Sequence, residues 1–173
     1  MAAGIFCEFA LPDDPYLDRF SSGYERTDDY FCSREWFNPD KGRSAPPTYV
    51  FRVAKGGPMV GYCAFDFGKQ PHPDDASTTK ARYLVIYMIG VDQAFQGTQN
   101  PLVSGQTYAA SILAVLEVIA RAKQSCVGLS LWVRSNNGVA MAFYRKVGFT
   151  ADPAGPSRRD EGDPILTMRK LLT

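Results

Sequence analysis

The sequence is poor in the residues that most often bind metals or form disulfides. Its 173 residues include one histidine, His72, in a proline-flanked polar stretch typical of an exposed loop. A single histidine argues against a histidine-rich metal centre and against a Ser-His-Asp triad. The four cysteines, Cys7, Cys32, Cys63 and Cys126, are widely spaced and include no Cys-x-x-Cys pair. This spacing fits neither a zinc site nor the disulfide framework of a secreted domain, so we expect free thiols and no metal.

A charge surplus and long apolar runs are also lacking. The chain has 19 Lys and Arg against 18 Asp and Glu, a formal net charge of +1. Without a cationic surplus it offers little counterion release to a phosphate backbone, which argues against nucleic acid as a partner. No apolar run reaches about 18 residues, and the N-terminus lacks both a basic start and a long apolar stretch. We therefore expect a cytoplasmic protein with no membrane association.

The apolar content is sufficient for a folded core. Hydrophobic residues make up 45% of the chain and charged residues 21%, a balance that excludes disorder as the overall state. The sequence has no internal repeat and no linker that would separate two halves. We expect a single domain over residues 1–173.

Hydrophobic periodicity predicts a fold that contains both strands and helices. Strands are predicted at residues 5–11, 48–54, 59–67, 82–91, 127–133 and 164–172, with a further strand from Phe149. Helices are predicted at 15–27, 28–37, 105–123 and 139–147, and polar loops at 38–47, 69–80 and 151–163. Trp36 and Phe37 are expected in the core, and the apolar run 82–91 is expected to be a central strand. This order indicates an α/β (α+β) fold with helices on both faces of one sheet.

The segment Val91–Leu116 is informative about chemistry. A strand ends in the turn Gln96–Gly97, and the pair Ser104–Gly105 precedes a long helix. Backbone N–H groups at a helix start lack partners, and the helix dipole adds about half a positive charge there. Glycine lets an anion approach the backbone closely, so this segment fits a phosphate or pyrophosphate without lysine or arginine. An ordinary connection between a strand and a helix is the alternative interpretation.

A second segment, Ser135–Phe149, reads S-N-N-G-V-A-M-A-F-Y-R-K-V-G-F. It matches every fixed position of the pattern N-x-x-A-x-x-[LF]-Y-x-[KR]-x-G-F, through Asn137, Ala140, Phe143, Tyr144, Lys146, Gly148 and Phe149. Upstream, a V-x-x-x-[YF]-Q-G stretch is matched by Val91, Phe95, Gln96 and Gly97. In these two motifs the chain resembles the GNAT superfamily of N-acetyltransferases, which use acetyl-CoA. The resemblance covers residues from about Arg82 to the C-terminus.

The resemblance implies a fold, and the sequence departs from the family motif at one place. The implied fold is GNAT-like, with one mixed, mostly antiparallel sheet of about six to seven strands, helices on both faces and a splayed central strand pair. The family motif continues as Q-G-x-G-x-G, whereas the glycine that follows Gly97 here is Gly105. Gly105 corresponds either to the last family glycine, with an insertion of about four residues, or to the middle one, with about six. Helix periodicity favours the former.

The resemblance also implies how acetyl-CoA is bound, with no metal. Backbone groups near Ile89 and Val91 are expected to pair with pantetheine, and an N–H there to polarise the thioester carbonyl. Asn137 is expected to contact the pantetheine arm, and it also suits the N-cap of the following helix. The pyrophosphate is expected to lie against Gln96, Gly97, Thr98, Gly105 and Gln106.

Tyr144 is the residue expected to protonate the departing thiolate, and a packed helix aromatic is the alternative interpretation. No general base is evident. Glu8, Glu35 and Asp66 are candidates only by the elements on which they lie, and a water relay or a weakly basic amine is equally compatible.

The leading hypothesis is transfer of acetyl from acetyl-CoA to a primary amine of a small molecule or protein, by direct attack in a ternary complex. One alternative is a toxin-like GNAT enzyme that acetylates aminoacyl-tRNA, suggested by the stretch Tyr16–Phe20. Another is a non-catalytic acyl-CoA-binding domain with a degenerate pyrophosphate loop. A Rossmann domain fits less well, because no G-x-G-x-x-G follows the first strand. A homodimer is compatible with the sequence, which does not identify the acceptor.

Overall fold

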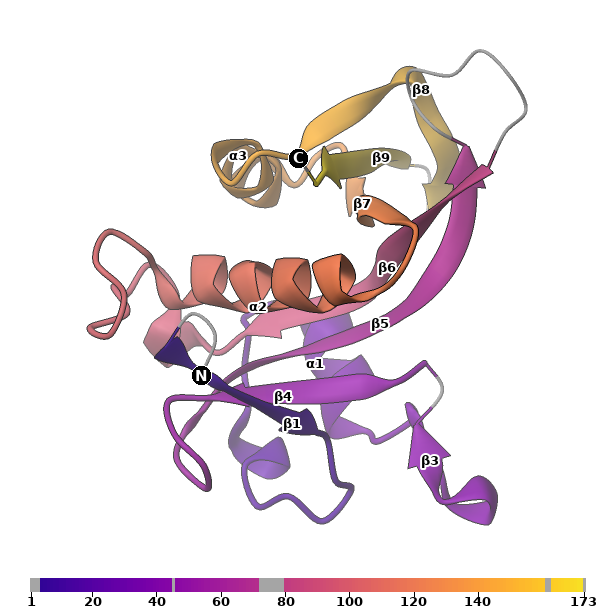
Figure 1. Ribbon diagram of the computed structural model, residues 1–173. Coiled ribbons are helices and arrows are strands. Elements are labelled where there is room, and N and C mark those ends of the chain that lie inside the picture. Colours follow the sequence, from indigo (N-terminus) through magenta and orange to yellow (C-terminus); the bar gives the residue numbers. More distant parts are fainter. Residues whose placement is uncertain (1–3, 45, 72–79, 161–162, 173) are drawn as a thin grey trace. The chain divides into compact units, whose positions relative to one another are not determined.

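The computed structural model describes residues 4–44, 46–71, 80–160 and 163–172 (Figure 1). The chain divides into two compact units. The first, here the N-terminal unit, comprises Met1–Asp66 and Tyr87–Val118, and the second, here the C-terminal unit, comprises Phe67–Ile86 and Ile119–Thr173. The expectation of a single domain stays a prediction.

Seven strands form the main sheet, and two of them, β5 and β6, contribute residues to both units. The strand order is β1 (Phe6–Phe9), β4 (Thr48–Arg52), β5 (Met59–Pro71), β6 (Lys80–Val91), β7 (Cys126–Arg134), β9 (Asp163–Leu171) and β8 (Thr150–Asp160). The described pairings are antiparallel except that of β6 with β7, which is parallel. The mixed, mostly antiparallel sheet and the central place of the 82–91 strand are thus confirmed.

Helices cover both faces of the sheet in the N-terminal unit. Neighbouring strand residues point to opposite faces, so Gly61 and Tyr62 of β5 report on the two sides. The Tyr62 ring stacks on Phe31 of α1 (Glu25–Cys32), with centroids 4.0 Å apart. On the other face, a Cβ at Gly61 would lie 3.1 Å from Cδ1 of Ile112 in α2 (Tyr108–Ala122). The two helices therefore pack on opposite faces, as predicted.

The core beneath α1 is aromatic. Trp36, Phe31 and Tyr62 are each at most 1% exposed, and Leu17 and Phe20 pack in the same cluster. The indole Nε1 of Trp36 donates to the Phe31 carbonyl at 2.8 Å, so burial leaves this polar group satisfied. Trp36 is confirmed as a core residue, whereas Phe37 is only partly buried.

The helix predicted at 15–27 is wrong. The chain forms one 3-10 turn, η2 (Leu17–Arg19), and α1 begins only at Glu25. The intervening Ser21–Gly23 is held by Asp28, whose carboxylate accepts from the Ser22 amide at 2.7 Å and from the Ser22 hydroxyl at 2.6 Å. Serine side chains that bond to a nearby carboxylate and amide compete with helical bonding, and a left-handed glycine follows them. The helix predicted at 28–37 likewise ends at Cys32, and the loop at 38–47 contains a short ladder of β2 (Phe37–Asn38) with β3 (Arg43–Ser44) and the 3-10 turn η3 (Pro39–Lys41).

In the C-terminal unit β6 pairs with β7 from Arg82 to Ile86, and α3 (Gly138–Lys146) lies between β7 and β8 along the chain. The loop predicted at 151–163 is wrong, because β8 runs to Asp160 and pairs with β9. Its prolines and register shifts are tolerated because β8 is the last strand in the sheet order, and an edge strand need not donate on both sides. In the loop predicted at 69–80, β5 extends to Pro71 and β6 begins at Lys80, while His72 and its neighbours lie outside the described residues.

Burial raises the pKa of two thiols and one phenol in the N-terminal unit. It raises the pKa of the Cys7 thiol to about 11, with a smaller contribution from the charge of Glu8. Burial likewise raises the pKa of the Cys63 thiol, which is fully buried, and of the Tyr62 phenol. The folded chain therefore holds these protons more tightly than the unfolded chain does.

We expect the free energy of unfolding to fall as the pH rises above about 9. The unfolded thiols lose their protons at their ordinary pKa, whereas the folded thiols keep them, so the stability present below that pKa is lost as the pH approaches the folded values. Urea denaturation at a series of pH values between about 7 and 10.5 measures this fall. Cys63→Ala should make the free energy of unfolding fall less steeply with pH above about 9. An unchanged slope in that variant would contradict the contribution assigned to the Cys63 thiol.

Candidate active site

At the end of β6, in the N-terminal unit, some backbone N–H and C=O groups face the strand edge that is opposite β5. The Asp92 amide donates to the Val60 carbonyl of β5 at 2.9 Å. Because alternate residues of an extended strand direct their N–H and C=O to opposite edges, the groups of Val91 and Ile89 face the other edge. The described pairing of β6 with β7 extends only to Ile86, whereas β6 continues to Val91. These are the two residues whose backbone was predicted to pair with pantetheine.

The turn after β6 uses some of its amides internally. Asp92 caps the 3-10 turn η4 (Gln93–Phe95) by accepting from the Ala94 amide at 2.9 Å. Of the residues predicted to hold pyrophosphate, three donate their amides within the turn: Gln96 to Asp92 at 3.1 Å, Thr98 to Phe95 at 3.2 Å and Gln106 to Val103 at 3.2 Å.

Several further amides in this turn have no acceptor among the described residues, and two of these belong to glycines. The two glycines are Gly97 and Gly105, which have φ values of 69° and 74°. A Cβ at either position would meet nothing within 4 Å, so both glycines border open space. Their left-handed backbone is one that other residues rarely adopt. An approachable, unpaired amide is the feature that an anion needs, so the residues present fit a pyrophosphate.

The inserted segment Gln99–Val103 is an ordered excursion. Asn100 is 3% exposed, and its Nδ2 donates to Ser111 Oγ of α2 at 2.9 Å. The Asn100 amide donates to the Gln106 carbonyl at 2.7 Å, and Gln99 forms an isolated bridge with Thr107. The base of the excursion is therefore closed, while Pro101 and Leu102 at its tip are exposed. The sequence located the insertion but did not identify Asn100 as the residue that anchors it. Only the burial of Asn100 in the structure reveals this role.

The segment Ser21–Gly23 lies against the same turn and was not predicted to do so. The Gln93 amide donates to the Ser21 carbonyl at 2.8 Å, and the Ser21 amide donates to the Asp92 carboxylate at 3.3 Å. Gly23 has φ of 78° and lies so close to the Gln93 side chain that a Cβ would collide with it. The Ser-Ser-Gly tripeptide is a turn signal in the sequence, but its partner in the turn lies about 70 residues away.

In the C-terminal unit, Asn137 and Tyr144 lie on or beside α3. Asn137 Oδ1 accepts from the Ala140 amide at 3.0 Å, which confirms that it caps this helix. Tyr144 is 9% exposed, and its ring centroid lies 5.7 Å from that of Phe149. The Phe149 amide donates to the Tyr144 carbonyl at 2.9 Å, so the main chain also joins the end of the helix to the following strand. The packed position of Tyr144 is confirmed, and its role as an acid stays a prediction.

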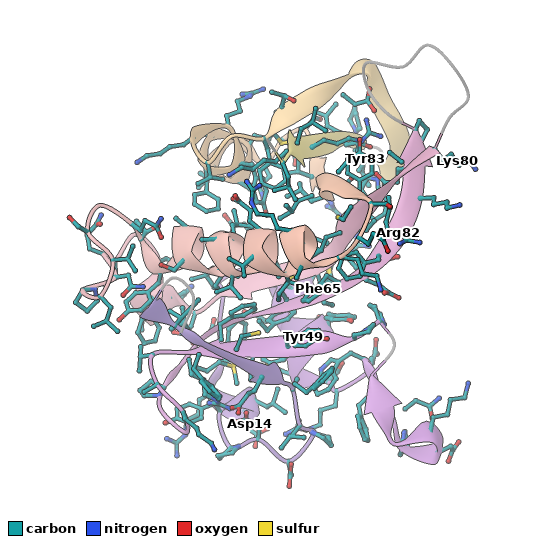
Figure 2. The ribbon with its side chains drawn as sticks, in the orientation of Figure 1. Asp14, Tyr49, Phe65, Lys80, Arg82 and Tyr83 are labelled. Atoms are coloured by element: carbon teal, nitrogen blue, oxygen red, sulfur yellow. The ribbon has the colours of Figure 1, made fainter. Side chains whose placement is uncertain are left out.

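The three carboxylates named as candidate bases occupy different settings. Glu8 accepts from Arg52 Nε at 2.7 Å, and Arg52 also pairs with Asp14, which is labelled in Figure 2. Arg52 and Asp14 are buried, and Glu8, whose side chain is 35% exposed, lies at the edge of this ion-pair network. Glu35 and Asp66 are exposed. Their roles as bases stay predictions.

Within the described part of the chain, no group of three or more His, Cys, Asp or Glu side chains is arranged to hold a metal ion. None of the helices in that part combines the length and the apolar character needed to cross a bilayer.

Comparison with curated protein sequences gives no match. Solved structures match the fold. A bacterial toxin has a TM-score of 0.67 at 16% identity, over 96% of this chain and 90% of its own. A mutant of the toxin AtaT bound to the C-terminus of the antitoxin AtaR and acetyl-CoA has a TM-score of 0.59 at 18% identity, over 96% and 93% of the two chains. AtaT complexed with acetyl-methionyl-tRNAfMet has a TM-score of 0.58 at 17% identity, over 94% and 93%.

Ard1 from Thermoplasma volcanium has a TM-score of 0.58 at 19% identity, over 98% of this chain and 99% of its own. At such identities the structural likeness supports the fold alone. The sequence model of the acetyltransferase (GNAT) family matches residues 10–149, which include the turn after β6, the Asn137 cap and Tyr144. The resemblance found in the two motifs is thereby confirmed, and the chain belongs to the GNAT acetyltransferase family.

Proposed function

We propose that this protein transfers an acetyl group from acetyl-CoA to a primary amine by direct attack in a ternary complex. The observation that carries the proposal is the family match over residues 10–149, since GNAT enzymes use acetyl-CoA and acetylate amines. The exposed Gly97 and Gly105 amides support it, because they fit the diphosphate of this cosubstrate without any basic side chain.

The proposed contacts of acetyl-CoA differ in kind along the turn. The amides of Gly97 and Gly105 donate to the pyrophosphate. Gln96, Thr98 and Gln106 shape the turn through their own internal bonds, and these bonds hold the two glycine amides in place before the ligand arrives. Such preorganisation saves the ordering cost that a flexible loop would incur on binding.

The reacting end uses the edge of β6 that faces away from β5. Main-chain groups of Ile89 and Val91 pair with pantetheine, and an N–H there polarises the thioester carbonyl as negative charge develops on its oxygen. The Asn137 side-chain amide nitrogen, which the helix cap does not require, contacts the pantetheine arm.

The chemical step conserves atoms and charge. The amine nitrogen attacks the carbonyl carbon and passes one of its protons to water or to a carboxylate, and the C–S bond breaks to give the amide and the thiolate. Tyr144 donates a proton or a hydrogen bond to the departing sulfur. Ordinary pKa values of about 10 for a phenol and 8.5 for a thiol make a strong hydrogen bond a better description than full early transfer.

The first test is binding of acetyl-CoA to a glycine variant. Gly97→Ala should raise the Kd of acetyl-CoA about fivefold to thirtyfold, because a left-handed alanine is strained by about 1–2 kcal/mol and its methyl group crowds the amide. Gly56→Ala is the matched control, since Gly56 has the same φ of 69°, also borders open space and lies in the turn between β4 and β5. Calorimetry measures both. Equal affinities in the two variants would contradict the proposed contact.

A second test concerns the acid. Tyr144→Phe keeps the packed ring and removes the hydroxyl, so kcat should fall about tenfold to a hundredfold while the Kd of acetyl-CoA stays the same. Transfer of isotopically labelled acetyl to a panel of primary amines gives the rates. Tyr49→Phe, at a tyrosine of β4 whose ring stacks on Phe9 and Phe65, serves as control. An unchanged kcat would leave Tyr144 with its packing role alone, and binding without transfer to any acceptor would favour the non-catalytic alternative.

A second candidate function is acetylation of aminoacyl-tRNA. The fold likeness to AtaT, which has been solved with acetyl-methionyl-tRNAfMet, favours it. The net charge of +1 argues against it, because tRNA binding draws on counterion release by basic residues.

Offering charged tRNA and free amines in parallel with labelled acetyl-CoA separates the two acceptors. We expect label on the amines, at a rate that changes little with salt. Label on the aminoacyl group, at a rate that falls steeply with salt, would assign the tRNA function instead.

A further inference from the structure

The side chain of Gln96 joins two segments that are far apart in the sequence. Its Nε2 donates to the Val91 carbonyl at 2.8 Å and to the Ser22 carbonyl at 2.7 Å. A primary amide carries two hydrogens, so both are engaged. Although Gln96 is exposed, its amide nitrogen thus links the end of β6 to the segment Ser21–Gly23.

The bond to Val91 bears on the edge to which the reacting end of the cosubstrate is assigned. The Val91 carbonyl faces away from β5, together with its own N–H and the groups of Ile89. Gln96 takes one of the two acceptor positions of this carbonyl, so a ligand on the same edge shares it and has in addition the Val91 N–H and the groups of Ile89. Gln96 also fixes the peptide plane that joins Val91 to Asp92.

The bond to Ser22 acts on a segment that is held firmly from its other side. Asp28 of α1 accepts from the Ser21 hydroxyl at 3.2 Å as well as from Ser22. Gly23 has a left-handed backbone and lies against the end of the Gln93 side chain, where a Cβ would require that side chain to move. Ser21–Gly23 is therefore an ordered segment beside the turn. The turn contacts this segment mainly through Asp92, Gln93 and Gln96.

Gln96 also precedes Gly97, whose amide borders open space. An anion on the Gly97 amide would restrain the peptide that joins these two residues, and Gln96 would pass this restraint on to Val91 and Ser22. Two segments that share one donor in this way respond together when either is ordered.

We propose that Gln96 is a positioning residue that couples occupancy of the Gly97 amide to the order of the Ser21–Gly23 segment. The inference rests on the proposed use of acetyl-CoA. In the protein without ligand, the Gln96 amide holds the two carbonyls in place. When acetyl-CoA binds, the turn is restrained and Ser21–Gly23 becomes less able to open.

The test compares Gln96→Met with Gln99→Met. Methionine matches glutamine in length and removes the donor without adding charge, and Gln99 lies in the same turn, with no side-chain hydrogen bond among the described residues. Calorimetry gives the Kd of acetyl-CoA, and amide hydrogen exchange of residues 22–24 is measured with and without acetyl-CoA. Thermal unfolding of each variant reports on stability separately.

In the unaltered protein we expect acetyl-CoA to slow exchange in residues 22–24 by about tenfold. Gln96→Met should raise the Kd by about tenfold and abolish this slowing, and Gln99→Met should do neither. A lower Tm in Gln96→Met with an unchanged Kd and unchanged ligand-dependent protection would overturn the inference, because Gln96 would then be merely structural. If the unaltered protein fails to bind acetyl-CoA, the proposed function fails instead. If it binds but transfers no acetyl, the coupling stands without the enzymatic activity.

Discussion

The hydrogen bond from the Asp92 amide to the Val60 carbonyl fixes which edge of β6 each main-chain group faces. With this bond on the β5 side, the groups of Ile89 and Val91 lie on the opposite edge. A slip of one residue would exchange the two sets and turn every side chain to the other face. Close approach protects the register, since a Cβ at Gly61 would collide with the Gly90 carbonyl oxygen of β6. The chemistry assigned to this edge therefore depends on a glycine in the neighbouring strand.

The turn after β6 illustrates how a nearly neutral chain can present an anion site. Most of its amides are consumed by internal bonds, which give the turn a single shape, and the anchored Asn100 closes the inserted loop below it. The amides left without an acceptor among the described residues include a pair from glycines at positive φ, and these two glycines border open space. Attraction then comes from oriented main-chain dipoles rather than from lysine or arginine. This arrangement is consistent with a net charge of only +1.

The parts predicted well from the sequence are those in which local pattern and packing agree. The central strand 82–91, the helix from Tyr108 and the short helix before Gly148 each show the periodicity of the face they bury. The helix predicted across Ser21–Gly23 was wrong because side-chain bonds to Asp28 outweigh a helical pattern there. The start of β8 was predicted at Phe149, but its continuation over residues 151–160 was missed because its prolines and glycine are typical of a loop. Its place at the sheet edge makes them tolerable.

The candidate site was harder to predict because several of its contacts join side chains to distant main-chain atoms. Nothing near Gln96 in the sequence indicates that its side-chain amide donates to the Ser22 carbonyl. Hydrophobic periodicity gives no information about the partners of an exposed glutamine. The glycines and Asn137, by contrast, carry local signals, since a left-handed turn and a helix cap are set by the residues that form them. Sequence patterns thus reveal the main-chain features of a site more readily than the side chains that hold them.

The motif around Tyr144 combines a structural unit with a chemical one. Asn137 starts α3, Gly148 at φ 95° ends it, and the Phe149 amide returns to the Tyr144 carbonyl. These contacts place the Tyr144 ring against Phe149 whether or not its hydroxyl takes part in a reaction. Loss of activity after a large change in this motif therefore does not identify an acid. Only a substitution that keeps the ring and removes the oxygen separates the two roles, because packing depends on the ring and proton donation depends on the hydroxyl.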